Sequence, residues 1–536
     1  MSEGFDYIVI GAGSAGCVLA ERLSADPTRR VLVLEAGGRD DWIWFHIPVG
    51  YLYAIGNPRA DWMFRTEALA GLAGRSLAYP RGRVIGGSSA INAMIYMRGQ
   101  AADYDRWRQM GLSGWGWDDV LPEFLEQEDH VRPPNALHRS GGRWHVDYPR
   151  MRWDVLEAFG EAAELEGIPR VDDFNGGDNR GAGYFQVNQK HGRRWSAASA
   201  FLKPALRRPN LKLETGAHVM AVVIENGRAV GVRYRRDGVE LLARARGEVV
   251  LAAGAVATPK ILELSGIGDG ARLANLGVET IAHRPGVGEN LQDHLQLRPI
   301  YKVRGVTTMN ALDRGFLGRP LMALEYALLR RGPLSMAPSQ YGAFAFSSAE
   351  HATPNLQFHA QPLSLDRFGE PLHPFPAITL SVCNLRPTSR GSIHARSPDP
   401  MDAPAIDPNY LATPEDCRVA VEALQLVRRI VARPPLARFA PEEFLPGVHA
   451  QGEAGLLQAA REIGTTIFHP VGTARMGSPQ DVGAVVDARL KVIGIDGLRV
   501  ADASVMPTIV SGNTNSPTMV IAGKAARMLI EDERGR

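Results

Sequence analysis

Cysteine is scarce in this sequence: only Cys17, Cys383 and Cys417 occur among 536 residues, far apart from one another. Three widely separated cysteines form neither a disulfide framework nor a paired zinc site, and such usage is typical of a reducing compartment. We find no apolar run long enough to span a bilayer. Residues 5–10 read as the first strand of a folded motif rather than as a secretory signal. We therefore expect no metal site and a cytoplasmic protein, either free or peripheral to the inner membrane.

The sequence also lacks an excess of either charge. It has 60 basic and 58 acidic residues, giving a formal net charge of +2, and the basic residues are scattered. This distribution excludes nucleic acid as a main partner. Hydrophobic residues make up 45% and charged residues 22% of the chain, which is typical of a soluble globular protein. We expect a monomer or a homodimer.

A chain of 536 residues is too long for one hydrophobic core, so more than one domain is expected. Strand and helix patterns alternate in residues 5–36, 210–254 and 497–530, and loop-rich stretches separate them. The pattern predicts an α/β fold: a Rossmann-type nucleotide-binding domain assembled from discontinuous segments, and an inserted domain with an antiparallel sheet and helices. The expected segments are 1–150, 193–298 and 461–536 for the nucleotide-binding domain, and 151–192 and 299–460 for the inserted domain.

A glycine motif follows the first predicted strand. Gly11 permits a tight turn, Gly13 lets the backbone approach a pyrophosphate, and Gly16 lets the following helix pack closely on the strand. The helix begins at Ser14 and Ala15, where unpaired N–H groups and the positive end of the helix dipole favour phosphate. The motif therefore predicts a dinucleotide site.

A second predicted strand, residues 31–34, ends in Glu35 and Ala36. The separation of Glu35 from the glycine motif is close to that of a carboxylate that accepts hydrogen bonds from ribose hydroxyls. Strand, glycines, helix, second strand and acid occur in this order, which makes a purely structural glycine turn the weaker interpretation. The motif alone leaves NAD and FAD open.

Residues 80–92 resemble the first signature of the glucose–methanol–choline (GMC) oxidoreductases. Residues 254–268 are similar to the second signature, and residues 286–294, 469–477 and 502–507 also match the family in order. The resemblance covers nearly the whole chain, and it is strongest to bacterial choline-dehydrogenase-like and aliphatic-alcohol dehydrogenases. It implies FAD rather than NAD as the cofactor.

The resemblance also implies roles for single residues. Asn92, Ala93 and Met94 lie against the isoalloxazine ring, Val219 pairs with adenine through its backbone, and Asp502 contacts the ribityl or pyrophosphate portion. For residues outside the glycines, the alternative is a packing role. The other residues expected at the FAD site are Arg83, Val84, Gly86, Gly87, Ser88, Ile95, Ala253, Gly254, Ala503, Asn513 and Thr514.

One position departs from part of the family. Some relatives carry a histidine immediately before the asparagine of the first signature and join it covalently to the flavin. This chain has Ile91 there. Nothing else in that loop can form such a bond, so we predict non-covalent FAD.

Oxidation of an alcohol carbon by hydride transfer needs a base for the hydroxyl proton. His469, in the motif of residues 469–477, is the predicted base because a histidine is largely neutral near pH 7. Asn513 cannot act as a base but can hold the substrate oxygen by hydrogen bonding. Helix capping is the alternative role for Asn513, and His359 is the next candidate base. We interpret His294 as structural.

The substrate pocket is less constrained by the sequence. Gln340 occupies a loop that carries an acidic residue in choline-type relatives, so a cationic alcohol is disfavoured. Phe358, Gln361 and Phe468 predict a mostly apolar cavity with a few amides, although core packing is an equal alternative. We expect a small neutral primary alcohol, aliphatic or benzylic, as substrate.

The electron acceptor stays open between a quinone, another carrier and oxygen, with a dehydrogenase favoured by the resemblance. Two other activities remain as alternatives, since some relatives cleave cyanohydrins as hydroxynitrile lyases and another decarboxylates fatty acids in light.

Overall fold

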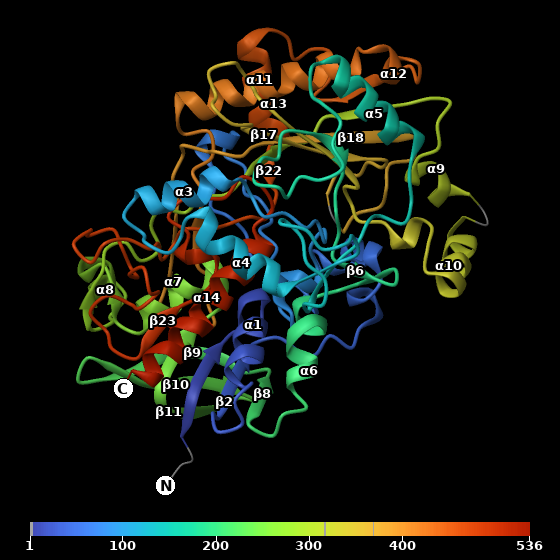
Figure 1. Cartoon of the computed structure of the whole chain (residues 1–536). Coiled ribbons are helices and arrows are strands. Elements are labelled where there is room, and N and C mark those ends of the chain that lie inside the picture. The colour runs from blue at the N-terminus through green and yellow to red at the C-terminus, as the bar shows by residue number, and fades with distance from the viewer. Residues whose placement is uncertain (1–3, 316–317, 368, 536) are drawn as a thin grey trace.

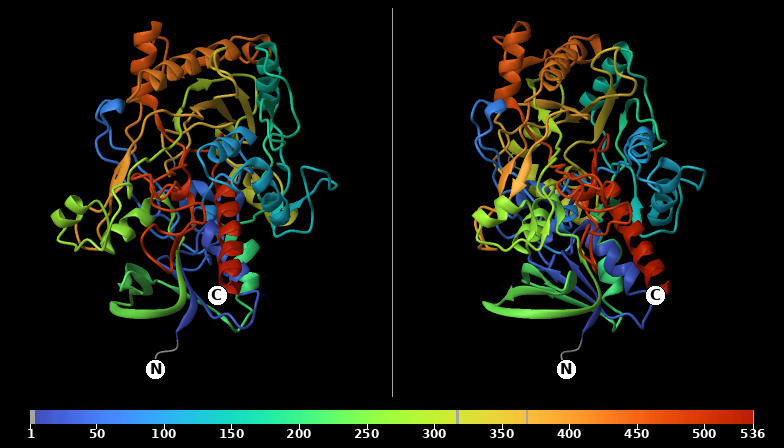
Figure 2. Two further views of the ribbon diagram at one scale, coloured as in Figure 1. Left: turned by 60° about the vertical axis from the view of Figure 1, so that its left-hand side comes forward. Right: turned by 90° about the vertical axis from the view of Figure 1, so that its left-hand side faces the viewer.

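The computed structural model describes residues 4–315, 318–367 and 369–535. Two sheets stand at opposite ends of the molecule, and Figure 1 shows them in its lower and upper halves. The first and last parts of the chain lie together at the lower end, beside the first sheet. Figure 2 shows the same separation from two further sides.

The first sheet has seven strands in the order β8-β2-β1-β11-β10-β9, and β23 pairs with β11 off this path. Parallel pairing joins β1 to β2 and β11, and β11 to β23. Every residue of β2 is buried, as expected for a parallel strand covered on both faces. The bounds are β1 (Phe5–Ile10), β2 (Val31–Glu35), β8 (Leu211–Thr215), β9 (His218–Glu225), β10 (Arg228–Arg236), β11 (Val239–Leu251) and β23 (Leu498–Val500).

The glycine motif lies where the sequence predicts it, between β1 and helix α1 (Ser14–Leu23). Helix α14 (Asn515–Arg534) packs beside α1. A hydrogen bond of 2.6 Å from Ser14 Oγ to Asn515 Oδ1 joins the first turns of the two helices. The first sheet and its helices confirm the predicted α/β fold with a Rossmann-type half.

The second sheet has eight strands, and its neighbouring strands pair antiparallel. Helices α5, α11, α12 and α13 cover its outer side at the top of Figure 1. The strands are β5 (Gly181–Tyr184), β14 (Leu295–Leu297), β15 (Ile300–Lys302), β16 (Tyr341–Ala345), β17 (Leu356–Gln361), β18 (Ala377–Asn384), β21 (Glu442–Leu445) and β22 (Thr465–Thr466). The helices are α5 (Asp154–Leu165), α11 (Pro414–Val431), α12 (Pro434–Ala437) and α13 (Gly452–Ile463).

Most strands of the second sheet come from the segments 151–192 and 299–460, whereas β14 and β22 come from just outside them. The five-segment division of the chain stays a prediction. The other helices are α2 (Tyr51–Ala54), α3 (Ala101–Gln109), α4 (Trp117–Gln127), α6 (Lys203–Ala205), α7 (Gly254–Leu264), α8 (Gly270–Asn275), α9 (Met309–Arg314) and α10 (Gly318–Leu329). Paired short strands are β3 (Glu128–His130) with β4 (Trp144–Val146), β6 (Gln189–Lys190) with β7 (Arg193–Arg194), β12 (Ile267–Gly268) with β13 (Ala282–His283), and β19 (Ser392–His394) with β20 (Ala405–Asp407). Within the described ranges, no helix combines the length and apolar character needed to cross a membrane.

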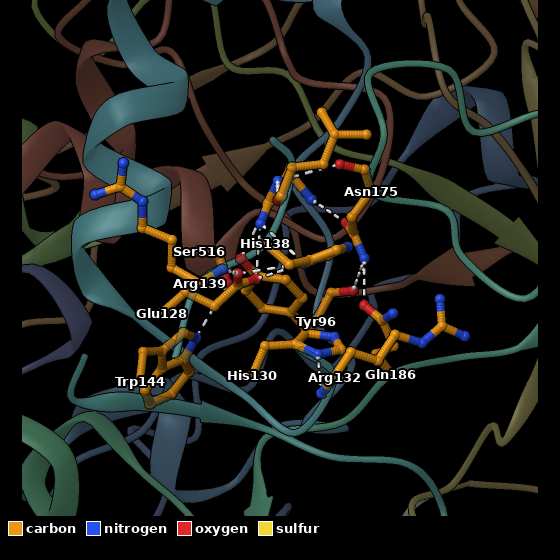
Figure 3. A network of polar contacts seen from close by, with 12 residues as sticks. Tyr96, Glu128, His130, Arg132, His138, Arg139, Trp144, Asn175, Gln186 and Ser516 are labelled. Atoms are coloured by element: carbon orange, nitrogen blue, oxygen red, sulfur yellow. Dashed lines mark hydrogen bonds and ion pairs between the residues drawn. The ribbon is translucent and has the colours of Figure 1, made fainter. Parts of the chain in front are cut away.

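A buried polar network fastens the segment that follows the first signature (Figure 3). Arg98 lies between Glu128, whose Oε1 accepts from Arg98 Nη2 at 2.7 Å, and Asn175, whose Oδ1 accepts from the Arg98 backbone N–H at 2.9 Å. His138 Nδ1 also lies 3.2 Å from Glu128. Removing either Arg98 or Glu128 would leave a buried charge without its partner, so this network holds the segment after the first signature against its neighbours.

Candidate active site

A long cavity runs between the two sheets. At one end its walls come from the glycine motif, from Glu35 and from the start of β9. At the other end they come from β17, from the loop of Phe468 and His469, and from the loop before α14. Residues far apart in the sequence therefore line one continuous site.

The glycine motif forms a tight crossing with the first signature. Gly11 has a φ of +99°, which favours glycine, and a Cβ on Gly16 would lie 1.8 Å from the Gly11 carbonyl oxygen. Gly87 has a φ of +52°, and a Cβ there would lie 2.7 Å from Gly13 Cα. These approaches leave backbone, rather than side chains, facing the cavity beside the N-terminus of α1, where phosphate binds well.

Glu35 lies at the glycine-motif end of the cavity together with Ala36 and Val219. Its Oε2 accepts from the Ala12 N–H at 2.8 Å and its Oε1 from the Gly37 N–H at 2.7 Å. Burial raises the pKa of Glu35 to about 6. A carboxylate has about four acceptor sites, so Glu35 can still accept from ribose hydroxyls.

At the opposite end, Asn92 Oδ1 accepts from the Met94 N–H at 2.9 Å and from Arg194 Nη1 at 3.0 Å. Met94 has a φ of +60°, and this contact helps to hold that uncommon backbone conformation. Asp502 accepts from the N–H groups of Gly254 and Ser504, both at 2.8 Å, and so joins the start of α7 to the C-terminal segment.

Most of the predicted site residues line this cavity. Four predicted cofactor residues support it from behind instead: Gly16 packs on the Gly11 turn, Arg83 stacks over Trp62, Val84 is part of an apolar cluster, and Gly86 donates to Ala12 O. The lining includes Gly11, Gly13, Ser14, Ala15, Glu35, Ala36, Gly87, Ser88, Asn92, Ala93, Met94, Ile95, Val219, Ala253, Gly254, Gln361, Phe468, His469, Asp502, Ala503, Asn513 and Thr514.

Two predicted pocket residues lie elsewhere. Gln340 is fully buried outside the cavity lining, where its Oε1 accepts from Trp153 Nε1 at 2.7 Å and its Nε2 donates to Met151 O at 3.1 Å. Phe358 packs into the apolar core with its ring centroid 6.2 Å from that of Phe159. Phe358 therefore has the core-packing role that the sequence left as an alternative, whereas Gln340 is held by buried hydrogen bonds outside the cavity.

The predicted catalytic pair meets at the cavity. His469 Nε2 lies 3.2 Å from Asn513 Nδ2, and Asn513 Oδ1 accepts from Gln357 Nε2 at 3.2 Å. On the other side of the ring, His469 Nδ1 lies 3.0 Å from His294 Nδ1. His294 Nε2 in turn lies 3.2 Å from Leu385 O. His294 is thus a site residue that the sequence interpretation missed.

The Leu385 carbonyl sets the donor and acceptor roles in this series of hydrogen bonds, because a carbonyl oxygen only accepts hydrogen bonds. His294 must therefore carry its proton on Nε2, which leaves Nδ1 as an acceptor for the Nδ1–H of His469. The second ring nitrogen of His469, Nε2, then has a free lone pair that faces Asn513. The hydrogen bonds thus select the tautomer in which His469 can accept a proton from the cavity side.

Burial lowers the pKa of His469 well below its usual value, and the neighbouring His294, His359 and Arg81 disfavour its protonated form further. Burial also lowers the pKa of His294 to about 4. Both rings are consequently neutral near pH 7, as the tautomer argument requires.

The backbone around His469 is clamped from both sides. Asp293 Oδ1 accepts from the His469 N–H at 2.8 Å, while its Oδ2 accepts from the hydroxyls of Tyr79 and Thr466 at 2.8 and 2.6 Å. Arg81 Nη2 donates to Phe468 O at 2.6 Å. Phe468 has a φ of +71°, which is rare for a bulky residue, so these contacts maintain a strained turn that directs His469 into the cavity.

Comparison with known proteins agrees with this geometry. The family described as GMC oxidoreductase matches residues 5–296 with its N-terminal part and residues 387–522 with its C-terminal part. The chain belongs to the GMC oxidoreductase family. The resemblance of its five signature motifs is therefore confirmed.

Several members of the GMC family match nearly the full chain. The chain is 41% identical to "Alcohol dehydrogenase [acceptor]" of Pseudomonas putida, covering 98% of this chain and 96% of that one. It is 39% identical to "Choline dehydrogenase, mitochondrial" of Homo sapiens, covering 98% and 89%. Among solved structures, pyridoxine 4-oxidase from "Mesorbium loti" matches with 33% identity and a TM-score of 0.88, covering 98% and 99%.

As a GMC oxidoreductase, the chain is an FAD-dependent enzyme that acts on CH–OH donors. Its cavity fits this cofactor, because the crossing of Gly13 and Gly87 is a cradle that a Cβ would fill, and the Glu35 carboxylate lines the cavity beside the glycine motif. Ile91, which also lines the cavity, has no atom that could bond to flavin, in agreement with non-covalent binding.

Proposed function

We propose that this enzyme oxidises an uncharged primary alcohol to the aldehyde, with His469 as general base and Asn513 holding the substrate oxygen. The observation that carries the proposal is the meeting of His469 Nε2 and Asn513 Nδ2, 3.2 Å apart at the cavity. One atom is an acceptor and the other a donor. A hydroxyl group matches this pair, because its O–H donates while its oxygen accepts.

In the proposed mechanism, the substrate hydroxyl takes the place of the direct contact between His469 and Asn513. Its O–H donates to His469 Nε2, and its oxygen accepts from Asn513 Nδ2. FAD, when bound, supplies the hydride acceptor. His469 takes the hydroxyl proton as the hydride leaves, so that a neutral aldehyde forms.

The charges around the cavity support a neutral substrate. Among the described residues that line it, the carboxylates are Glu35 and Asp502, and both belong to the dinucleotide part. A cationic alcohol such as choline would need a carboxylate or an aromatic cage at the substrate end. Beside the rings of Tyr51 and Phe468, the polar side chains present there are neutral amides and hydroxyls such as Gln296, Gln361 and Ser339, and no carboxylate accompanies them at that end among the described lining residues.

We further propose that the electrons pass to a quinone or another carrier. The name of the Pseudomonas putida relative, "Alcohol dehydrogenase [acceptor]", supports this choice. Oxygen is the alternative acceptor, because the matched pyridoxine 4-oxidase is named as an oxidase.

Peripheral contact with an anionic membrane is part of this proposal. Leu321, Leu324, Leu328 and Leu329 of α10 are all more than half exposed. Arg330 and Arg331 follow the helix directly. An apolar helix face bordered by arginines suits the surface of an anionic bilayer.

The base is tested by His469→Ala and Asn513→Ala, each compared with the unmodified enzyme in anaerobic stopped-flow reduction of the flavin. General-base contributions are typically about 10²–10⁴-fold, and we expect His469→Ala to lose at least that much. Asn513→Ala should lose less, since a neutral hydrogen bond contributes about 0.5–1.5 kcal/mol, or more where a buried partner is left unpaired.

Equal FAD content in all three proteins is the control. A His469→Ala enzyme that reduces its flavin at the unmodified rate would refute the role of His469. If no alcohol bleaches the flavin without air, alcohol oxidation itself is wrong, and a lyase or a photodecarboxylase takes its place.

A further inference from the structure

The central strand β17 carries an unusual row of polar side chains. Its residues are all buried, and they alternate between the two faces of the sheet. Leu356, Phe358 and Ala360 lie on one face and pack into the apolar core beneath the helices. Gln357, His359 and Gln361 occupy the opposite face, which is the face of the cavity. Buried polar groups without hydrogen bonds are costly, so such a row needs partners.

The protein supplies only some of these partners. Gln357 Nε2 donates to Asn513, and Gln361 Nε2 donates to Ser339 Oγ at 3.0 Å. Gln361 Oε1 and both ring nitrogens of His359, however, have no hydrogen-bond partner among the described residues. The His359 and Gln361 side chains are 1% and 4% exposed and line the cavity.

The row also has a direction relative to the reaction. Gln357 contacts Asn513 and therefore marks the reactive end. Residues two apart on a strand are separated by about 6.8 Å, so His359 and then Gln361 lie progressively farther along the cavity wall. A molecule whose carbinol carbon lies between His469 and Asn513 would extend past His359 toward Gln361.

The unpartnered atoms define the chemical group that fits there. Gln361 Oε1 is an acceptor and requires a donor from the ligand. His359 is neutral, because burial and the nearby His294 lower its pKa to about 3, and its ring offers one donor and one acceptor. A hydroxyl group both donates and accepts, whereas an ether only accepts. An ammonium group would lack a carboxylate partner at this end of the described cavity.

We propose that His359 and Gln361 form a second hydrogen-bonding subsite that binds a distal hydroxyl of the substrate, so that the preferred substrates are neutral diols or polyols rather than simple alkanols. This inference rests on the proposed alcohol oxidation and specifies its substrate class. A simple alkanol would leave the subsite atoms unpaired, which disfavours it by about 5- to 150-fold if a buried unsatisfied group costs about 1–3 kcal/mol.

The test compares hexanol with its terminal diol by kcat/KM in the holoenzyme, and extends to terminal diols of four and eight carbons. We expect the best diol to exceed the matching alkanol by at least about 5-fold. Gln361→Met keeps a similar volume without the acceptor amide and should bring this ratio close to one by lowering the diol value. Gln340→Met is the matched control, because Gln340 is a buried glutamine outside the cavity, and its ratio should stay that of the unmodified enzyme.

A tertiary diol, whose carbinol carbon has no hydrogen, gives a second readout that needs no turnover. It should bind more tightly than the matching tertiary alcohol, as measured by perturbation of the flavin absorbance, and lose this advantage in Gln361→Met. The subsite proposal would be overturned if alkanols and diols had equal kcat/KM values and Gln361→Met left these values unchanged. Alcohol oxidation itself would still stand. If no alcohol reduces the flavin, the oxidation proposal falls, and the tertiary-diol comparison alone decides whether the subsite exists.

Discussion

Replacing His294 tests whether the histidine pair sets the tautomer of the base. In the structure, His294 Nδ1 lies 3.0 Å from His469 Nδ1, and His294 contacts Leu385 O through its other nitrogen. His294→Phe keeps a buried ring but removes the acceptor. The Nδ1–H of His469 then has no partner, and the tautomer with its lone pair turned away from the substrate becomes competitive.

The size of the effect follows from the cost of one unsatisfied buried donor. Such a group costs about 1–3 kcal/mol, which corresponds to about 5- to 150-fold in the rate of flavin reduction. The loss should be smaller than in His469→Ala, because the base itself remains. His294→Asn should recover much of the rate, since the asparagine Oδ1 can occupy nearly the position of the histidine Nδ1.

The assay is anaerobic stopped-flow reduction over a range of substrate concentrations, with FAD content measured for each variant. We expect the limiting reduction rate to fall while the substrate dissociation constant changes little. His373→Phe is the matched control, because His373 is a buried histidine that does not line the cavity. An unchanged reduction rate in His294→Phe, or an equal loss in His294→Phe and His294→Asn, would refute the tautomer argument.

Three further predictions concern stability and location. Asp293→Asn should destabilise the fold by about 1.5–3 kcal/mol or more in chemical denaturation, because a charged acceptor of several buried donors is lost; an unchanged midpoint would contradict this. His359 stays neutral when folded, with a pKa of about 3 against an ordinary 6.5, so folding stability falls as the pH drops below about 6.5. Between pH 7 and pH 5 this one group should lower the free energy of unfolding by about 2 kcal/mol. The His359→Phe variant should lose correspondingly less stability between these two pH values. Replacing both Leu324 and Leu328 with glutamate should abolish co-sedimentation of the protein with anionic vesicles without changing its activity on soluble substrate. If the variant and the unmodified enzyme sediment equally, α10 is excluded as the membrane contact.

The dinucleotide half of the site could be predicted from local sequence because its chemistry depends on local spacing. Gly11, Gly13 and Gly16 must stand at fixed intervals between a strand and a helix, and the structure places them at that turn. His469 and Asn513 were found through family motifs, not through spacing. Their meeting at 3.2 Å depends on the tertiary fold.

The substrate wall could be predicted only in part, because it depends on which face of a strand points inward. Phe358 and Gln361 belong to one strand, yet their separation of three residues places them on opposite faces. Gln340 has an amide like Gln361, but its amide is already hydrogen-bonded to Met151 and Trp153, which directly precede α5. The role of His294 needs the position of Leu385 O, 91 residues away in the sequence, which no local pattern reveals.

The hydrogen bond between Ser14 and Asn515 joins residues 501 positions apart in the sequence. During synthesis the glycine turn before α1 emerges about 500 residues ahead of helix α14, which packs on α1 and follows the loop of Asn513. The apolar side of α1 therefore stays uncovered while almost the whole chain is translated. Long-range closure of this kind is slow and exposes the nascent chain to aggregation. We therefore expect productive loading with FAD to follow the synthesis of α14, because Asn513 and Thr514 in the preceding loop line the cavity, and we expect chaperone supply and flavin supply to affect the yield of active enzyme.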